Sequence, residues 1–199
     1  MSLRDFVYNK DFVIVVGDNG SGKTTVVRYL VEGVPKDKVY VLNASGQKWD
    51  FAKKNVQNPL MYSNEFFNKY CVNFLAKHSN CTLILDDADN FNIKHNDYLK
   101  SLVINARHAS IGVILSVRQV QDIDKIIYKQ AKSYISYQSV DYDTVYLSKM
   151  MPRTIAEYTK TLNEYEFLNF CYEGVKPVYR KFKVPEQFAS KWHNYTKGE

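Results

Sequence analysis

Eight residues near the N-terminus, Gly17-Asp-Asn-Gly-Ser-Gly-Lys-Thr24, have the types and the spacing of a phosphate-binding loop. The glycines let the backbone curl so that successive N–H groups point at the β- and γ-phosphates of a nucleotide, and the helix that follows adds its dipole. We expect Lys23 to bridge the phosphate oxygens and the hydroxyl of Thr24 to hold Mg²⁺. The residues predicted to bind the nucleotide are Gly17, Asp18, Asn19, Gly20, Ser21, Gly22, Lys23, Thr24 and Thr25.

Two carboxylates, Asp86 and Asp87, directly follow the apolar run Leu83-Ile-Leu85. Carboxylates at the end of a buried strand are costly unless a cation or a metal ion accompanies them. We expect Asp86 to orient Mg²⁺ or its waters, and Asp87 to polarise an attacking water. This pair favours ATP hydrolysis over phosphoryl transfer to a small molecule. The alternative is that Asp86, Asp87 and Asp89 only cap the turn after a core strand.

Gln119 and two arginines complete the set of candidate catalytic residues. Gln119 follows the apolar strand predicted at 111–116, which we expect beside the strand that carries Asp86. There it can contact both the γ-phosphate and the attacking water, and so report hydrolysis to the rest of the molecule. Arg107 is a candidate for stabilising the charge on the transferred phosphoryl group of a neighbouring subunit, and Arg118 is a weaker one. Arg107 can equally be a solvated cation at a helix C-terminus.

These residues need a scaffold that brings several strand ends together. Apolar runs predict strands at 11–16, 38–42, 81–85, 111–116 and 133–137, and helical spacing predicts helices at 23–33, 64–78, 97–108 and 122–129. The alternation predicts an α/β fold of the P-loop NTPase type, a mostly parallel sheet covered by helices on both faces. After Asp141 the pattern is helical to about Asn169, then β-like from Val175 to Val184, with a polar tail from Pro185. We expect a single P-loop ATPase domain over 1–199, with a nucleotide-binding core at 1–140 and a C-terminal extension at 141–199.

Composition limits the class of protein. The chain has 199 residues, 45% of them hydrophobic, which excludes disordered and fibrous proteins. No run approaches the ~18 to 20 apolar residues of a membrane span, so no transmembrane segment is expected. Cys71, Cys81 and Cys171 lack metal-ligand spacing and suit the free thiols of a reducing cytoplasm. The net charge of +6 favours polyanionic partners, although charge alone fits equally a lysine-rich protein with no nucleic-acid role.

The order of the motifs resembles the FtsK–HerA superfamily of DNA-pumping ATPases, and especially the genome-packaging ATPases of double-stranded DNA viruses. The resemblance rests on GDNGSGKT (17–24), LILDD (83–87), INARHASIGVILSVRQ (104–119) and IYKQAKSYISYQ (127–138). The segments YEFL (165–168) and YRKF (179–182) are similar to the tails of viral packaging ATPases, so the likeness covers nearly the whole chain. Two departures stand out. Many members have Glu where this chain has Asp87, and bacterial translocases tend to carry an arginine where this chain has Lys132-Ser-Tyr134.

The resemblance implies a RecA/ASCE-like fold, Mg²⁺-dependent ATP hydrolysis and double-stranded DNA as the partner. It also implies a homo-oligomeric ring, a pentamer or a hexamer, that docks onto a capsid or membrane partner. For a viral protein, the resemblance implies a location in the host-cell cytoplasm, and transiently at the portal vertex of the capsid. Basic loop residues that are candidates for DNA contact are Lys48, Lys53, Lys54 and Lys94. Two alternatives stay open: a nucleoside or nucleotide kinase, although the chain lacks an obvious arginine-rich lid, and a P-loop ATPase of phage or pilus assembly and export.

Overall fold

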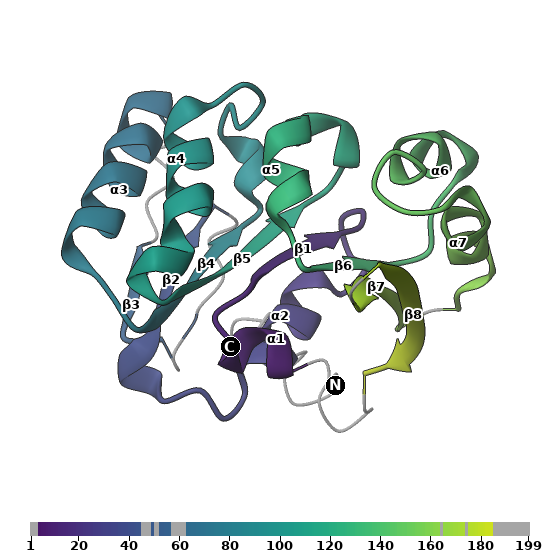
Figure 1. The fold of residues 1–199 in the computed structure, drawn as a ribbon, viewed down its shortest axis with the longest axis horizontal. Coiled ribbons are helices and arrows are strands. Elements are labelled where there is room, and N and C mark those ends of the chain that lie inside the picture. The colour runs from purple at the N-terminus through teal and green to yellow at the C-terminus, as the bar shows by residue number, and fades with distance from the viewer. Residues whose placement is uncertain are drawn as a thin grey trace, which may run out of the picture.

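The fold is built on one eight-stranded sheet with the strand order β3-β2-β4-β5-β1-β6-β7-β8. The computed structural model describes residues 4–44, 49, 52–56, 63–163, 165–173 and 175–184. Strands β1 to β6 are parallel, whereas β7 and β8 are antiparallel to their neighbours (Figure 1). The strands are β1 (Phe12–Val16), β2 (Val39–Asn43), β3 (Lys54–Val56), β4 (Cys81–Asp86), β5 (Ile111–Val117), β6 (Ser133–Ser136), β7 (Glu166–Glu173) and β8 (Lys176–Lys183).

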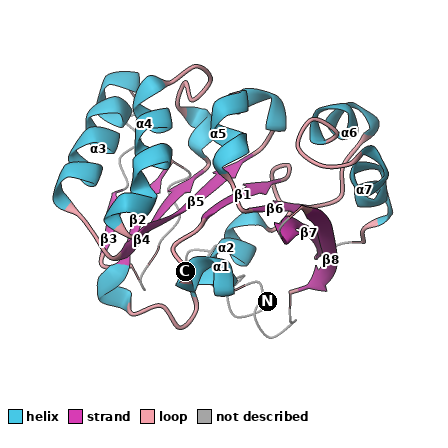
Figure 2. Ribbon diagram, viewed as in Figure 1, coloured by secondary structure: helices cyan, strands magenta, loops and turns pink. Residues whose placement is uncertain are grey.

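Helices cover both faces of this sheet, as Figure 2 shows. The described α-helices are α1 (Asp5–Tyr8), α2 (Lys23–Val31), α3 (Asn64–Lys77), α4 (Asp97–Ala106), α5 (Lys125–Gln130), α6 (Asp141–Leu147) and α7 (Arg153–Tyr158). Helices α3, α4 and α5 lie on one face, α1 and α2 lie on the other, and α6 and α7 lie beside the β6–β8 end. Short 3-10 turns follow the ends of several strands and helices. None of the described helices is long and apolar enough to cross a membrane.

The central strand β1 shows why both faces are covered. All five of its residues are buried. Because successive side chains of a strand point to opposite faces, Phe12, Ile14 and Val16 belong to the core beneath α3, α4 and α5. Val13 and Val15 belong to the second core, beneath α1 and α2. A continuous apolar run is therefore required here, where a half-exposed strand would alternate polar and apolar residues.

Strand β5 lies between β1 and β4, so that Ile14 pairs with Leu115 while Leu83 pairs with Val113. All three strands run in the same direction, and their carboxyl ends meet at one edge of the sheet. The loop after β1, the acidic turn after β4 and the residues after β5 are consequently neighbours in space. This order provides the scaffold that the sequence motifs require.

Most predicted elements are confirmed within a few residues, and the α/β fold with helices on both faces is confirmed. The prediction of helix to about Asn169 is wrong at its end, because α7 ends at Tyr158 and β7 begins at Glu166. Residues 167–171 of β7 are all buried, since the strand pairs with β6 and β8 and is covered on both faces. Two short elements, α1 and β3, were not predicted from the sequence. The tail from Pro185 and the candidate Lys48 lie outside the described residues, as does the side chain of Lys54.

Candidate active site

The phosphate loop joins the end of β1 to the start of α2, as the motif predicts. Gly20 and Gly22 have φ angles of 79° and 96°, a region that favours glycine. Gly17 is required for a different reason: a Cβ atom there would lie 2.6 Å from the hydroxyl oxygen of Ser21. The amide of Ser21 donates to the carbonyl of Asp18 at 3.2 Å and tightens the turn. The three glycines thus permit a loop whose amides can surround an anion.

Lys23 is the first residue of α2 and is almost fully buried, with 5% of its surface exposed. Its Nζ donates to the carbonyl of Asp18 at 3.0 Å and lies 3.9 Å from Oδ1 of Asp87. Burial lowers the pKa of Lys23, and the charges of Asp87 and Asp86 oppose that shift. The ammonium group therefore lies between the loop and the acidic turn, where it can contact a phosphate held by the loop.

Thr24 and Asp86 meet across the site, as predicted. The hydroxyl of Thr24 donates to Oδ2 of Asp86 at 3.4 Å, and Asp86 is fully buried at the end of β4. Burial, and then the charge of Asp87, raise the pKa of Asp86 to about 7, opposed by Ser116, Lys23 and Arg28. Among the described residues, no group forms a hydrogen bond of ordinary geometry with Oδ1 of Asp86. A buried carboxylate oxygen without such a partner, beside a hydroxyl, suits a hard cation such as Mg²⁺.

Asp87 has an unusual backbone. Its φ of 49° and ψ of 47° are left-handed, a conformation that Asp tolerates better than most residues, and it begins the 3-10 turn Ala88–Asn90. The carbonyl of Asp87 accepts a hydrogen bond from Nδ2 of Asn90 at 3.0 Å. Burial raises the pKa of its carboxyl group, and the nearby Lys23 opposes the change. A carboxylate with a raised pKa is a better proton acceptor near neutral pH.

The residues after β5 lie next to the phosphate loop. Gln119 and Arg118 line a cavity of about 460 Å³ together with Asp18, Asn19, Asp89 and Asp122. The side-chain oxygen of Gln119 accepts a hydrogen bond from Nε2 of Gln121. Arg118 instead donates to Asp89 through Nε and to Oδ1 of Asn90 at 3.3 Å, so it ties the end of β5 to the acidic turn. The structure thus brings Gln119 close to the loop and engages Arg118 in a structural role.

Arg107 lies elsewhere. It begins the 3-10 turn Arg107–Ala109 between α4 and β5, at the amino end of β5, and is exposed. It lines a separate cavity of about 200 Å³ that also contains Lys10, Asp11 and Lys132. Because the phosphate loop lies at the carboxyl ends of the strands, Arg107 is at the opposite edge of the sheet. It is not part of the site formed by its own chain.

Tyr137 contacts the phosphate loop, and the sequence motifs did not single it out. Its hydroxyl donates to the carbonyl of Gly22 at 2.7 Å, and its ring carbon Cδ2 lies 3.0 Å from the position that a Cβ atom at Gly17 would take. The ring packs against Phe167 of β7 at 5.9 Å between centroids. Tyr137 directly follows β6, which pairs with β1, and that pairing is the only signal that would have pointed to it. The C-terminal extension therefore supports the phosphate loop through β7.

Comparison with known protein families identifies this arrangement. A family model for the AAA domain matches residues 5–126, which include the phosphate loop, the acidic turn and the Gln119 strand end. The chain belongs to the AAA domain family. No curated protein matches the sequence significantly. This AAA domain is a P-loop ATPase that binds ATP, as the phosphate loop predicts.

Solved structures share the fold of this AAA domain. The genome packaging NTPase B204 of Sulfolobus turreted icosahedral virus 2, in complex with AMPPCP, matches with a TM-score of 0.73 and 23% identity, over 89% of this chain and 100% of that chain. The DNA-packaging ATPase B204 of Sulfolobus turreted icosahedral virus matches with a TM-score of 0.74 and 22% sequence identity, over 88% of this chain and 98% of that chain. The pCW3 conjugation coupling protein TcpA matches with a TM-score of 0.65 and 14% sequence identity, over 93% of this chain and 66% of that chain. The resemblance that the motifs predicted is thus confirmed as a likeness of fold.

Proposed function

We propose that this AAA domain is an ATP-driven DNA translocase, the motor that packages double-stranded DNA into a viral capsid. The observation that carries this proposal is the extent of the likeness to B204, which covers 89% of this chain and therefore extends beyond the residues 5–126 that match the family model. Within this chain, β7 pairs with β6 and its Phe167 packs against Tyr137, which supports the phosphate loop. The net charge of +6 adds support, because packaging requires contact with a polyanion.

The proposed chemistry is attack of water on the γ-phosphorus of ATP. Asp87 accepts a proton from the water as its oxygen bonds to phosphorus, and the bond to the β–γ bridging oxygen breaks. Lys23 contacts the β- and γ-phosphate oxygens, and Gln119 orients the water and responds to loss of the γ-phosphate. Thr24 and Asp86 would hold Mg²⁺, which when bound neutralises charge on the phosphates.

A homo-oligomeric ring, a pentamer or a hexamer, is part of the proposal. Arg107 is exposed and lies at the opposite sheet edge from the phosphate loop. A second copy is therefore needed if this guanidinium is to approach an ATP molecule, and the exposed position supports such a trans-acting role. We further propose that the ring acts in the host-cell cytoplasm and docks transiently on a capsid partner at the portal vertex.

The test is the ATPase rate with and without double-stranded DNA, measured together with the oligomeric state by light scattering. We expect DNA to increase the rate and the active species to be an oligomer. The Lys23→Ala variant serves as the control for contaminating ATPases, since it loses the phosphate contact of Lys23. The proposal would be refuted by a strictly monomeric protein whose ATPase rate does not change when DNA is added. It would also be refuted by phosphoryl transfer to a nucleoside acceptor without stimulation by DNA.

A further inference from the structure

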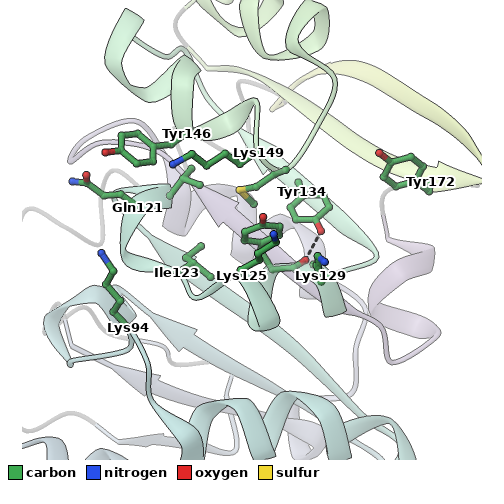
Figure 3. Close-up of a pocket in the computed structure, with 13 residues that line it drawn as sticks. Lys94, Gln121, Ile123, Lys125, Lys129, Tyr134, Tyr146, Lys149 and Tyr172 are labelled. Carbon is green, nitrogen blue, oxygen red and sulfur yellow. Dashed lines mark hydrogen bonds between the residues drawn. The ribbon is translucent and has the colours of Figure 1, made fainter.

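A second and larger cavity lies on the α5 side of the sheet, with a volume of about 840 Å³ (Figure 3). Its lining comes from α5, from the 3-10 turn after β5, from the end of α6 and from β6 and β7. Four lysines contribute to it: Lys94, Lys125, Lys129 and Lys149. All four are exposed, and none forms an ion pair with a carboxylate in the part of the chain that the structure describes. Among the residues that the structure describes, no acidic side chain lines this basic pocket.

Tyrosines form much of the remaining wall. Tyr134 donates its hydroxyl to the carbonyl of Tyr128, which fixes the ring at the base of the basic pocket. Tyr146 lies beneath the ammonium group of Lys149, 4.3 Å from Nζ to the ring centroid. Tyr172 extends from β7 toward the other end of the pocket (Figure 3). A concave surface with uncompensated lysines and aromatic rings suits a ligand that combines repeated phosphates with flat or apolar groups.

We propose that the basic pocket holds the phosphodiester backbone of one DNA strand, with its phosphates on the lysines and its sugars against the tyrosine rings. This inference rests on the proposed translocase function and assigns that function a contact surface. Lysine and tyrosine contacts to phosphate and sugar position a duplex without reading its sequence, which is what a packaging motor requires. Lys94 was already a sequence candidate for DNA contact, and the structure puts it in this pocket.

Hydrogen bonds connect the basic pocket to the ATP site. Gln121 lines the pocket, and its Nε2 donates to the side-chain oxygen of Gln119. The oxygen of Gln121 accepts from the hydroxyl of Tyr142 at 2.8 Å, and that hydroxyl lies 3.1 Å from the hydroxyl of Tyr146, in the pocket wall. These hydrogen bonds offer a route by which a change at Gln119, when the γ-phosphate leaves, would alter contacts on α6 and in the pocket. Through this series of hydrogen bonds, ATP hydrolysis changes the affinity of the pocket for DNA.

The first test removes two pocket charges. The double variant Lys125→Gln/Lys149→Gln is compared with Lys36→Gln/Lys77→Gln, which removes two exposed charges outside the pocket. Fluorescence anisotropy with a double-stranded oligonucleotide, over a range of salt concentrations, measures the affinity. We expect the pocket variant to bind at least about tenfold more weakly and to reduce the salt slope by about 2, because each phosphate contact contributes about 0.9. The control should bind within about twofold of the wild type, and its DNA-free ATPase activity should be unchanged.

The second test addresses the coupling. Gln121→Leu should lose the DNA stimulation of ATP hydrolysis even at saturating DNA, because it breaks the connection to Gln119. The inference is overturned if both charge variants bind DNA equally, or if Gln121→Leu is stimulated like the wild type. Wild-type protein that binds no DNA at all would instead overturn the proposed function itself.

Discussion

The buried carboxyl of Asp86 makes the stability of the nucleotide-free protein depend on pH. Its pKa is raised from 3.8 to about 7, mainly because the side chain is fully buried. In the unfolded chain the pKa of the Asp86 carboxyl group returns to its ordinary value, so the folded state binds the proton more tightly. The resulting stability is fully present below pH 4, and it is lost as the pH rises toward 7. We predict that Asp86→Asn, which stays neutral, removes this loss.

The expected size follows from the two pKa values. Each pH unit between them changes the free energy of unfolding by about 1.4 kcal/mol. Asp86 therefore costs the folded protein about 4 kcal/mol at pH 8 relative to pH 4, a cost that Asp86→Asn avoids. For a chain of this length that corresponds to a rise of about 10 °C in Tm at pH 8. The variant should have no Mg²⁺-dependent ATPase activity.

The assay is thermal or urea unfolding of the wild type and of Asp86→Asn from pH 4.5 to 8.5, without nucleotide or Mg²⁺. The difference between the two proteins isolates Asp86 from the other carboxyl groups, because those titrate in both. We expect the difference to grow up to about pH 7 and then to stay constant. Parallel curves, with no pH-dependent difference in stability, would show that the Asp86 carboxyl is ionised at little cost and would refute the reasoning.

Three further substitutions test the site. Asp87→Asn should leave ATP binding intact and reduce turnover by about 10²- to 10⁴-fold; equal steady-state rates would show that another group accepts the proton. Tyr137→Phe removes the hydrogen bond to the carbonyl of Gly22, so the free energy of unfolding should fall by about 1 kcal/mol in urea titrations. Gly22→Ala forces a side chain to a φ of 96° and should cost about 1–2 kcal/mol and weaken ATP binding in calorimetry. Wild-type affinity would contradict that expectation.

The parallel half of the sheet could be predicted from the sequence because its signals are local. The run 12–16 is apolar at every position, short, rich in valine and followed by Gly17, which is the pattern of a strand buried on both faces. Asp86 and Asp87 directly follow such a strand, so their place at a strand end followed as well. The turn chemistry of the phosphate loop is also local, since Gly20 and Gly22 have positive φ angles within a contiguous motif.

Contacts between distant segments could not be predicted in this way. The bond from Tyr137 to Gly22 joins residues 115 positions apart and depends on the pairing of β1 with β6. Residues 162–169 contain aromatic and aliphatic side chains that fit either a helix or a strand. The antiparallel pairing with β6 is what makes the segment from Glu166 a strand, β7. The hydrogen bonds of Arg118 with Asp89 and Asn90 likewise depend on where two loops meet.

The outermost strand, β8, limits how copies of this chain can associate. In the described part of the chain it pairs with β7 alone, and an edge strand of eight residues can template the addition of further strands. It contains Lys176, Arg180, Lys181 and Lys183, together with Pro177, which has no amide hydrogen to donate. Arg180 pairs with Glu173 at 3.8 Å and Lys181 with Glu166 at 3.0 Å, yet two such edges brought together would still place the basic side chains of both strands close to one another. Uncontrolled growth of one sheet onto another is therefore disfavoured at this edge.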